Sequence, residues 1–303
     1  MAQGPPQEGT RAMRSLPPPL SPPQLLELLV APVATLGELA ATVTAPRRRL
    51  WPLLYPESLH TDLRKFIWIL RDTLDHGNVT PLGQAVAALK ATPGATWANV
   101  RAKARDWREE LFVFEDRWVW LSQEASRLSE ALEEKAIAEA TTEDTDEAAT
   151  TGLAREEAVV ATRQTRAGTR REQQMEAALE LLERLINACQ EAIGFPWKLL
   201  RRLWFIEAAL EETEEAPPDV PETLVAMVTE AEWLWEAGAR LTTRHLLVTL
   251  GEIDFLLSSR NGNSGGPGGS RGRAVAELCQ RAIEDIPRLL EESDVTTVTS
   301  SGQ

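Results

Sequence analysis

The sequence contains few of the residues that most often carry catalysis, metal binding or covalent cross-links. It has two cysteines and three histidines among 303 residues. Cys189 and Cys279 lie far apart in helical patterns, which fits neither a disulfide framework nor a metal-ligand spacing. We therefore expect no metal, no cofactor and no disulfide, and we interpret both thiols as core residues of a cytoplasmic protein.

The histidines also lack the neighbours that a reactive centre would need. His60, His76 and His245 stand in no metal-ligand spacing. Ser58, His60 and Asp62 are close in sequence, but at a helix start they are typical of a cap, a surface residue and a first-turn acid. The chain has neither a phosphate-binding glycine loop nor a nucleophile elbow. The sequence favours a non-enzymatic protein, although a site assembled only by the fold stays open.

Positive charge is scarce relative to negative charge. The chain has 32 lysines and arginines against 46 acidic residues, which gives a formal net charge of −14. The resulting field repels phosphate backbones and anionic membrane surfaces unless a local basic patch overrides it. We therefore predict no nucleic-acid partner, and peripheral membrane contact is not the favoured interpretation.

Long uncharged apolar runs are missing as well. Residues 1–22 are rich in proline and have no apolar core of the length that a secretory signal needs. The most apolar stretch, residues 25–45, carries Glu27, Pro32 and Glu38, whereas a membrane span normally needs about 20 nearly charge-free residues. We expect a disordered tail over residues 1–22, a helix over 23–44 interrupted near Pro32, and no membrane-spanning helix.

What the sequence does contain is helical periodicity. From residue 97 onward, apolar positions alternate at steps of three and four over five heptads, which predicts one long helix over about 95–135. Phe112, Val113 and Trp120 lie off this stripe and indicate a second apolar face. We interpret the stripe as a core or interaction seam, and its members are Trp97, Val100, Trp107, Leu111, Phe114, Trp118, Leu121, Leu128 and Leu132, with Ala104 and Ala125 between them.

One local pattern occurs twice. Residues 120–128 read WLSQEASRL and residues 233–241 read WLWEAGARL, each after a similar order of glycine stops and proline starts. This order favours an internal duplication. The shared positions are Trp120 and Arg127 in the first copy and Trp233 and Arg240 in the second. We predict that the tryptophans pack on a second face and that the arginines form surface salt bridges.

The predicted fold class is therefore an all-α helical bundle built from two similar three-helix units with long amphipathic helices. The units occupy 23–135 and 170–258. An acidic and then arginine-containing linker is predicted over 136–169, although its first part also reads as a frayed extension of the long helix. A glycine-rich linker over 259–272, a final helix over 273–292 and a disordered tail over 293–303 complete the prediction.

Two stretches combine basic and aromatic residues and could contact a membrane or an acidic partner. For the second stretch we favour aromatics in the core with arginines at its rim; for the first, both interpretations stay open. The two sets are Arg47, Arg48, Arg49 and Trp51, and Trp197, Lys198, Arg201, Arg202 and Trp204.

The function predicted from sequence is that of a non-enzymatic scaffold or adaptor for protein–protein interaction. Its partner is unidentified, and a second copy packing along the long heptad seam is the most concrete candidate. The alternative is an amphipathic-helix protein that binds lipid surfaces. A small-molecule pocket inside the bundle is a third possibility.

Overall fold

Helices make up nearly all of the described structure. The computed structural model describes residues 20–44, 57–75, 82–91, 97–147, 156–211, 222–258 and 268–300, and these segments contain no strand. The helices are α1 (Pro22–Thr44), α3 (Glu57–Leu74), α4 (Leu82–Ala91), α5 (Trp97–Glu147), α6 (Glu156–Ala192), α7 (Gly194–Glu211), α8 (Glu222–Leu241), η1 (Thr242–Leu246), α9 (Leu247–Ser258) and α10 (Gly268–Ser300). The prediction of an all-α bundle is confirmed.

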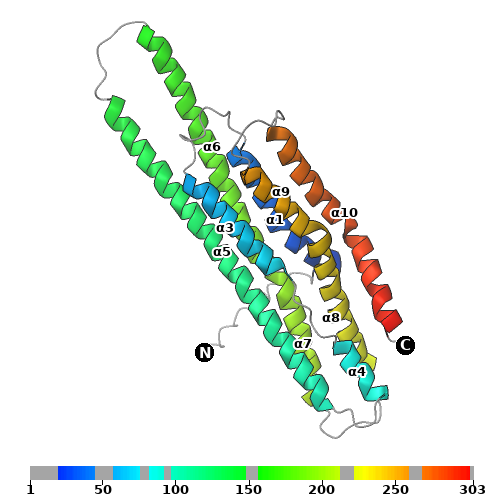
Figure 1. Cartoon of the computed structure of the whole chain (residues 1–303). Coiled ribbons are helices and arrows are strands. Elements are labelled where there is room, and N and C mark those ends of the chain that lie inside the picture. The colour runs from blue at the N-terminus through cyan, green and yellow to red at the C-terminus, as the bar shows by residue number, and fades with distance from the viewer. Residues whose placement is uncertain are drawn as a thin grey trace, which may run out of the picture.

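Helix α1 is the central element of the bundle. It packs against α6 and α10 on its two sides and also contacts α7, α8 and α9 (Figure 1). Leu26, Leu29, Leu36 and Leu39 are all fully buried. The helix runs through Pro32 without the predicted interruption. A proline removes one backbone hydrogen bond, and the packing on α1 outweighs that loss.

Because α1 is enclosed over most of its surface, its composition is largely apolar, and Glu27 and Glu38 occupy exposed positions. It is the one helix within the described ranges that is long and apolar enough to cross a membrane, and 61% of the qualifying window is buried inside the bundle. A core helix surrounded by other helices passes the same test of length and composition. The burial of α1 accounts for its apolar character.

The long helices α5 and α6 form one edge of the bundle and pack against each other (Figure 1). Helix α5 extends twelve residues beyond the predicted end at 135, and α6 begins at Glu156, inside the predicted linker. Alanine and glutamate are frequent in both extensions and are good helix formers, so a helix can persist there without an apolar stripe. The sequence left two interpretations of the residues after 135, a linker or an extension of the long helix. Over residues 136–147 the helix extension is observed.

The C-terminal helix is also longer than expected. Helix α10 spans Gly268–Ser300 instead of 273–292. Gly272, assigned to the linker, lies inside α10, and a Cβ at this position would fall 2.8 Å from the Cβ of Ala41 in α1. The glycine therefore serves close helix packing at this point. At the other end, Ser293 is fully buried, and its hydroxyl donates to the carbonyl oxygen of Leu289 at 2.8 Å.

The predicted pair of three-helix units is not confirmed. In the first set α3 packs along the long helix α5, whereas no comparable contact joins α6 to α8. The short helices behave more alike, because α4 packs on α5 and α7 packs on α8. The structure describes one continuous bundle with a shared hydrophobic core.

Candidate functional site

The long heptad seam is filled within the chain itself. Trp97 is half-buried, and the other predicted seam residues are buried: Val100, Trp107, Leu111, Phe114, Trp118, Leu121, Leu128 and Leu132. They lie on α5, which packs mainly against α6 and α7. A second copy of the chain would therefore have to use another face.

Aromatic rings from three helices meet at this seam. Phe114 on α5 lies 5.7 Å from Trp235 on α8 and 6.4 Å from Phe195 on α7, measured between ring centroids. Trp107 meets Trp235 edge to face at 6.3 Å, a geometry that aromatic pairs prefer. Sequence reasoning missed Trp235, although Val228, Ala231, Trp235 and Gly238 repeat the same spacing of three and four.

Packing holds the two tryptophans that α5 contributes to this seam core, Trp107 and Trp118. The indole N–H groups of Trp107 and Trp118 have no hydrogen-bond partner among the described residues, although both side chains are buried. A buried donor left in this way costs roughly 1–3 kcal/mol. The burial of the rings offsets that cost, and the cluster acts as a structural core.

The two tryptophans of the repeated pattern have different surroundings. Trp120 on α5 is 44% exposed, whereas the Trp233 Nε1–H donates to the carbonyl oxygen of Leu290 on α10 at 2.7 Å. Arg127 is exposed and pairs with Glu124 in the same helix. Arg240 contacts Glu236 at 2.9 Å and Glu292 of α10 at 3.7 Å. Trp233 and Arg240 of the second copy therefore anchor α10, whereas Trp120 and Arg127 of the first copy lie on the surface.

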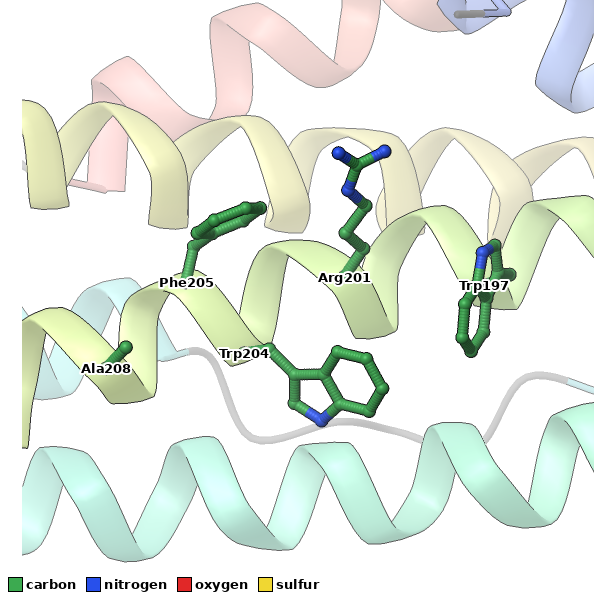
Figure 2. Close-up of a pocket in the computed structure, with 5 residues that line it drawn as sticks. All are labelled: Trp197, Arg201, Trp204, Phe205 and Ala208. Atoms are coloured by element: carbon green, nitrogen blue, oxygen red, sulfur yellow. The ribbon is translucent and has the colours of Figure 1, made fainter. Parts of the chain in front are cut away.

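Three exposed aromatic side chains gather on one face of α7. Trp197, Trp204 and Phe205 are 47%, 44% and 57% exposed, respectively. Together with Arg201 and Ala208 they line a shallow hollow (Figure 2). This placement corrects the expectation that the aromatics of this stretch belong to the core. The opposite face of α7 supplies the core instead, through Phe195, Leu199, Leu203, Ile206 and Leu210.

Contacts within the α7 face order its side chains. The rings of Trp197 and Trp204 meet edge to face at 5.7 Å, and the Arg201 guanidinium lies 6.0 Å from the centroid of Phe205. In Figure 2, Trp204 projects toward α5, and Arg201 and Phe205 project toward α8. Aromatic pairs and cation–π contacts of this kind stabilise an exposed arrangement by about 0.5–1 kcal/mol each.

The remaining basic residues of this stretch take different roles. Arg202 is half-buried and pairs with Glu230 on α8, so its charge is neutralised within the bundle. Lys198 is half-buried and has no carboxylate partner among the described residues. The first basic-aromatic stretch, with Arg47, Arg48, Arg49 and Trp51, lies outside the described residues.

The chemistry-bearing side chains do not converge on a reactive centre within the described parts of the chain, where no group of three or more metal-ligating residues occurs. Burial raises the pKa of Cys189 to about 12 and that of Cys279 to about 11. His245 lies in η1 and its Nε2 is 2.8 Å from Asp285 on α10. His60 is half-buried, and His76 lies outside the described residues.

Comparisons with protein families, curated proteins and solved structures find no match to this chain. The exposed face of α7 is the candidate site.

Proposed function

We propose that this protein is a non-enzymatic helical scaffold that binds a protein partner through the exposed face of α7. The observation that carries the proposal is the placement of Trp197, Trp204 and Phe205 at the surface, in contact with one another or with Arg201, while the opposite face of α7 is fully packed. Tryptophan and arginine are enriched among the residues that dominate binding energy at protein interfaces.

The energetics of exposed aromatics support this interpretation. Burying apolar surface is worth roughly 25 cal/mol per Å², and each large aromatic side chain can bury about 150–250 Å². A contiguous cluster of half-exposed rings is therefore a surface that gains from being covered. The Trp197–Trp204 and Arg201–Phe205 contacts hold these rings before any partner arrives, which lowers the entropy lost on binding.

The state of the thiols supports a non-catalytic role. The reactive form of a cysteine is the thiolate, and the raised pKa values of Cys189 and Cys279 keep both side chains protonated at neutral pH. The described histidine of η1 is engaged with Asp285, and this pair links two helices.

Binding to a lipid surface is the second candidate function, and the same face carries it. Tryptophan at headgroup depth and arginine on lipid phosphates are typical of interfacial helices. The net charge of −14 works against an anionic bilayer, which makes a protein partner the favoured interpretation.

The duplication of two three-helix units also stays a proposal. The order of helix starts and stops supports it, as does the similar docking of α4 on α5 and of α7 on α8. The different environments of Trp120 and Trp233 then record how the copies diverged.

Photo-crosslinking in cells tests the proposed binding face. A photoreactive phenylalanine analogue replaces Trp204 in one protein and Trp68, which is 61% exposed on α3, in a matched control. We expect a discrete protein adduct from position 204 and none of that size from position 68. Equal labelling at both positions, or no adduct at 204, would contradict the proposal. Flotation with vesicles that is lost when Trp197, Arg201 and Trp204 are replaced would instead support the lipid function.

A further inference from the structure

We propose that the exposed face of α7 binds the same face of a second copy of this chain, with the two α7 helices antiparallel. This inference rests on the proposed function and names its partner. It places self-association on α7, because the seam of α5 is filled within the chain.

The first support is the spacing of the exposed residues. Trp197, Arg201, Trp204 and Ala208 follow one another at steps of four, three and four, and Phe205 broadens the stripe. This is the spacing with which one helix packs along another. All four positions are exposed, so the stripe is open to solvent between α5 and α8 within the described chain. A partner helix is the element that its period fits.

The second support is the distribution of charge along α7. Lys198 and Arg201 lie in the first half of the helix, whereas the acidic residue Glu211 ends it. Lys198, Arg201 and Glu211 have no ion-pair partner among the described residues. By contrast, Arg202 and Glu207 are already paired, with Glu230 and Arg108.

This charge pattern is complementary to itself in one orientation. Antiparallel helices place the basic half of one copy opposite the acidic end of the other, whereas parallel helices would place like charges together. In the antiparallel register Trp204 lies opposite Phe205, Lys198 opposite Glu211, and Arg201 opposite Ala208 of the second copy. The small side chain of Ala208 leaves room for the guanidinium. Two-fold symmetry makes every one of these contacts twice.

An acidic partner of another kind fits the face less completely. Lys198 and Arg201 would attract such a partner, but Glu211 at the end of α7 would repel it. An anionic membrane would meet the same repulsion. A single helix pair is a small interface, and interfaces below about 1,200 Å² are typically transient. We therefore infer a weak and reversible dimer.

Sedimentation velocity on the whole chain tests the dimer, over protein concentrations from about 1 µM to about 300 µM to span a weak equilibrium. We expect wild-type protein to shift from monomer to dimer across this range. The matched variants Ala208→Glu and Ala208→Arg change one exposed helical position and should leave the fold intact, as circular dichroism will check. Opposite Arg201, glutamate should tighten the dimer and arginine should weaken it, each by about three- to tenfold.

The sign of this charge effect discriminates between partners. A dimer that Ala208→Arg tightens and Ala208→Glu weakens would overturn the antiparallel arrangement and point to an acidic face opposite α7. A wild-type protein that stays monomeric throughout would overturn the second copy as the partner. If position 204 still crosslinks to a different protein, the proposed function survives that result; without any adduct at 204, both proposals fail.

Discussion

At the scale of single residues, two helical glycines differ in what surrounds them. A Cβ on Gly37 in α1 would fall 2.5 Å from Cγ1 of Val275 in α10, whereas a Cβ on Gly251 in α9 would meet nothing within 4 Å. Val275 is buried and β-branched, so it cannot rotate away from its single favoured helical rotamer. Close packing of α1 on α10 therefore requires glycine at position 37, whereas no neighbouring atom requires glycine at position 251.

This difference predicts opposite effects of the same substitution. Gly251→Ala should stabilise the protein by about 0.5–1 kcal/mol, because alanine loses less backbone entropy in a helix. Gly37→Ala gains the same propensity but must move α10, at about 1–3 kcal/mol, so it should be destabilising by roughly 1 kcal/mol overall. Urea unfolding of both variants checks the prediction. Equal changes in the free energy of unfolding for the two variants would show that α1 and α10 do not pack so closely at Gly37 and Val275.

At the scale of elements, the half-buried carboxylate of Glu232 fixes the start of a short helix. The Gly83 backbone N–H, in the first turn of α4, donates to Glu232 on α8. Burial raises the pKa of Glu232, while hydrogen bonds from the Gly83 and Leu82 backbones lower it, with burial prevailing. A group with a raised folded-state pKa stabilises the fold most at low pH, and that contribution is lost as the pH rises through the raised value.

Two substitutions at Glu232 should therefore distinguish how its hydrogen bond to α4 and its negative charge each affect stability. Glu232→Ala leaves helix N–H groups without an acceptor and should cost about 1–2 kcal/mol. Glu232→Gln keeps an acceptor and removes the half-buried charge, so at pH 7 it should be at least as stable as wild type. Urea midpoints for both variants at pH 7 give the comparison, and a glutamine variant as unstable as the alanine variant would contradict it.

A second element, α10, is fastened by ionic contacts. Burial of Asp285 raises its pKa. The hydrogen bonds from His245 and Arg288, together with their charges, lower the pKa by more than burial raises it, so the pKa of Asp285 lies below its ordinary value. The stabilisation from Asp285 is therefore present at neutral pH and is lost as the pH falls below about 4. Asp285→Asn should cost about 1 kcal/mol at pH 7, and its difference from wild type should shrink toward zero in acid. Urea unfolding between pH 7 and pH 3 follows this difference, and a gap that stays constant would exclude Asp285 as its source.

Helices α5 and α7 differ in how well sequence periodicity predicts which of their faces is buried. The spacing from Trp97 to Leu132 predicted the buried side of α5, because one long helix with one apolar stripe has one way to face the core. Helix α7 has apolar residues on two faces, so periodicity alone could not tell that Leu199 and Leu203 are buried and Trp204 is exposed. The hydrogen bond between Glu232 and Gly83 joins residues 149 positions apart, and no local sequence pattern predicts it.

At the scale of the whole molecule, the fold depends on contacts between distant segments. Helix α10 covers α1 and α8 and contributes four large buried aliphatic side chains, Val275, Ile286, Leu289 and Leu290. Each is worth roughly 1.5–3 kcal/mol when buried. Their sum is comparable with the whole stability of a typical domain, about 5–15 kcal/mol. The sequence showed that a final helix exists, but only tertiary contacts show that it completes the core.

Truncation before Gly268 should therefore unfold or loosen the entire bundle and not merely remove one helix. We expect loss of cooperative urea unfolding and strong binding of a hydrophobic dye by the truncated chain. A synthetic peptide covering residues 268–300, added in trans, should reverse both changes. Unfolding of the truncated chain with a wild-type midpoint would show that α10 is dispensable.

The central place of α1 also has a consequence during synthesis. Translation produces this apolar helix before α6 and long before α10, the two helices that pack most extensively against it. A nascent chain must therefore carry Leu26, Leu29, Leu36 and Leu39 uncovered while more than a hundred further residues are added. Exposed surface of this kind aggregates readily or is bound by chaperones. Ribosome-bound intermediates should depend on such protection until the last helix docks.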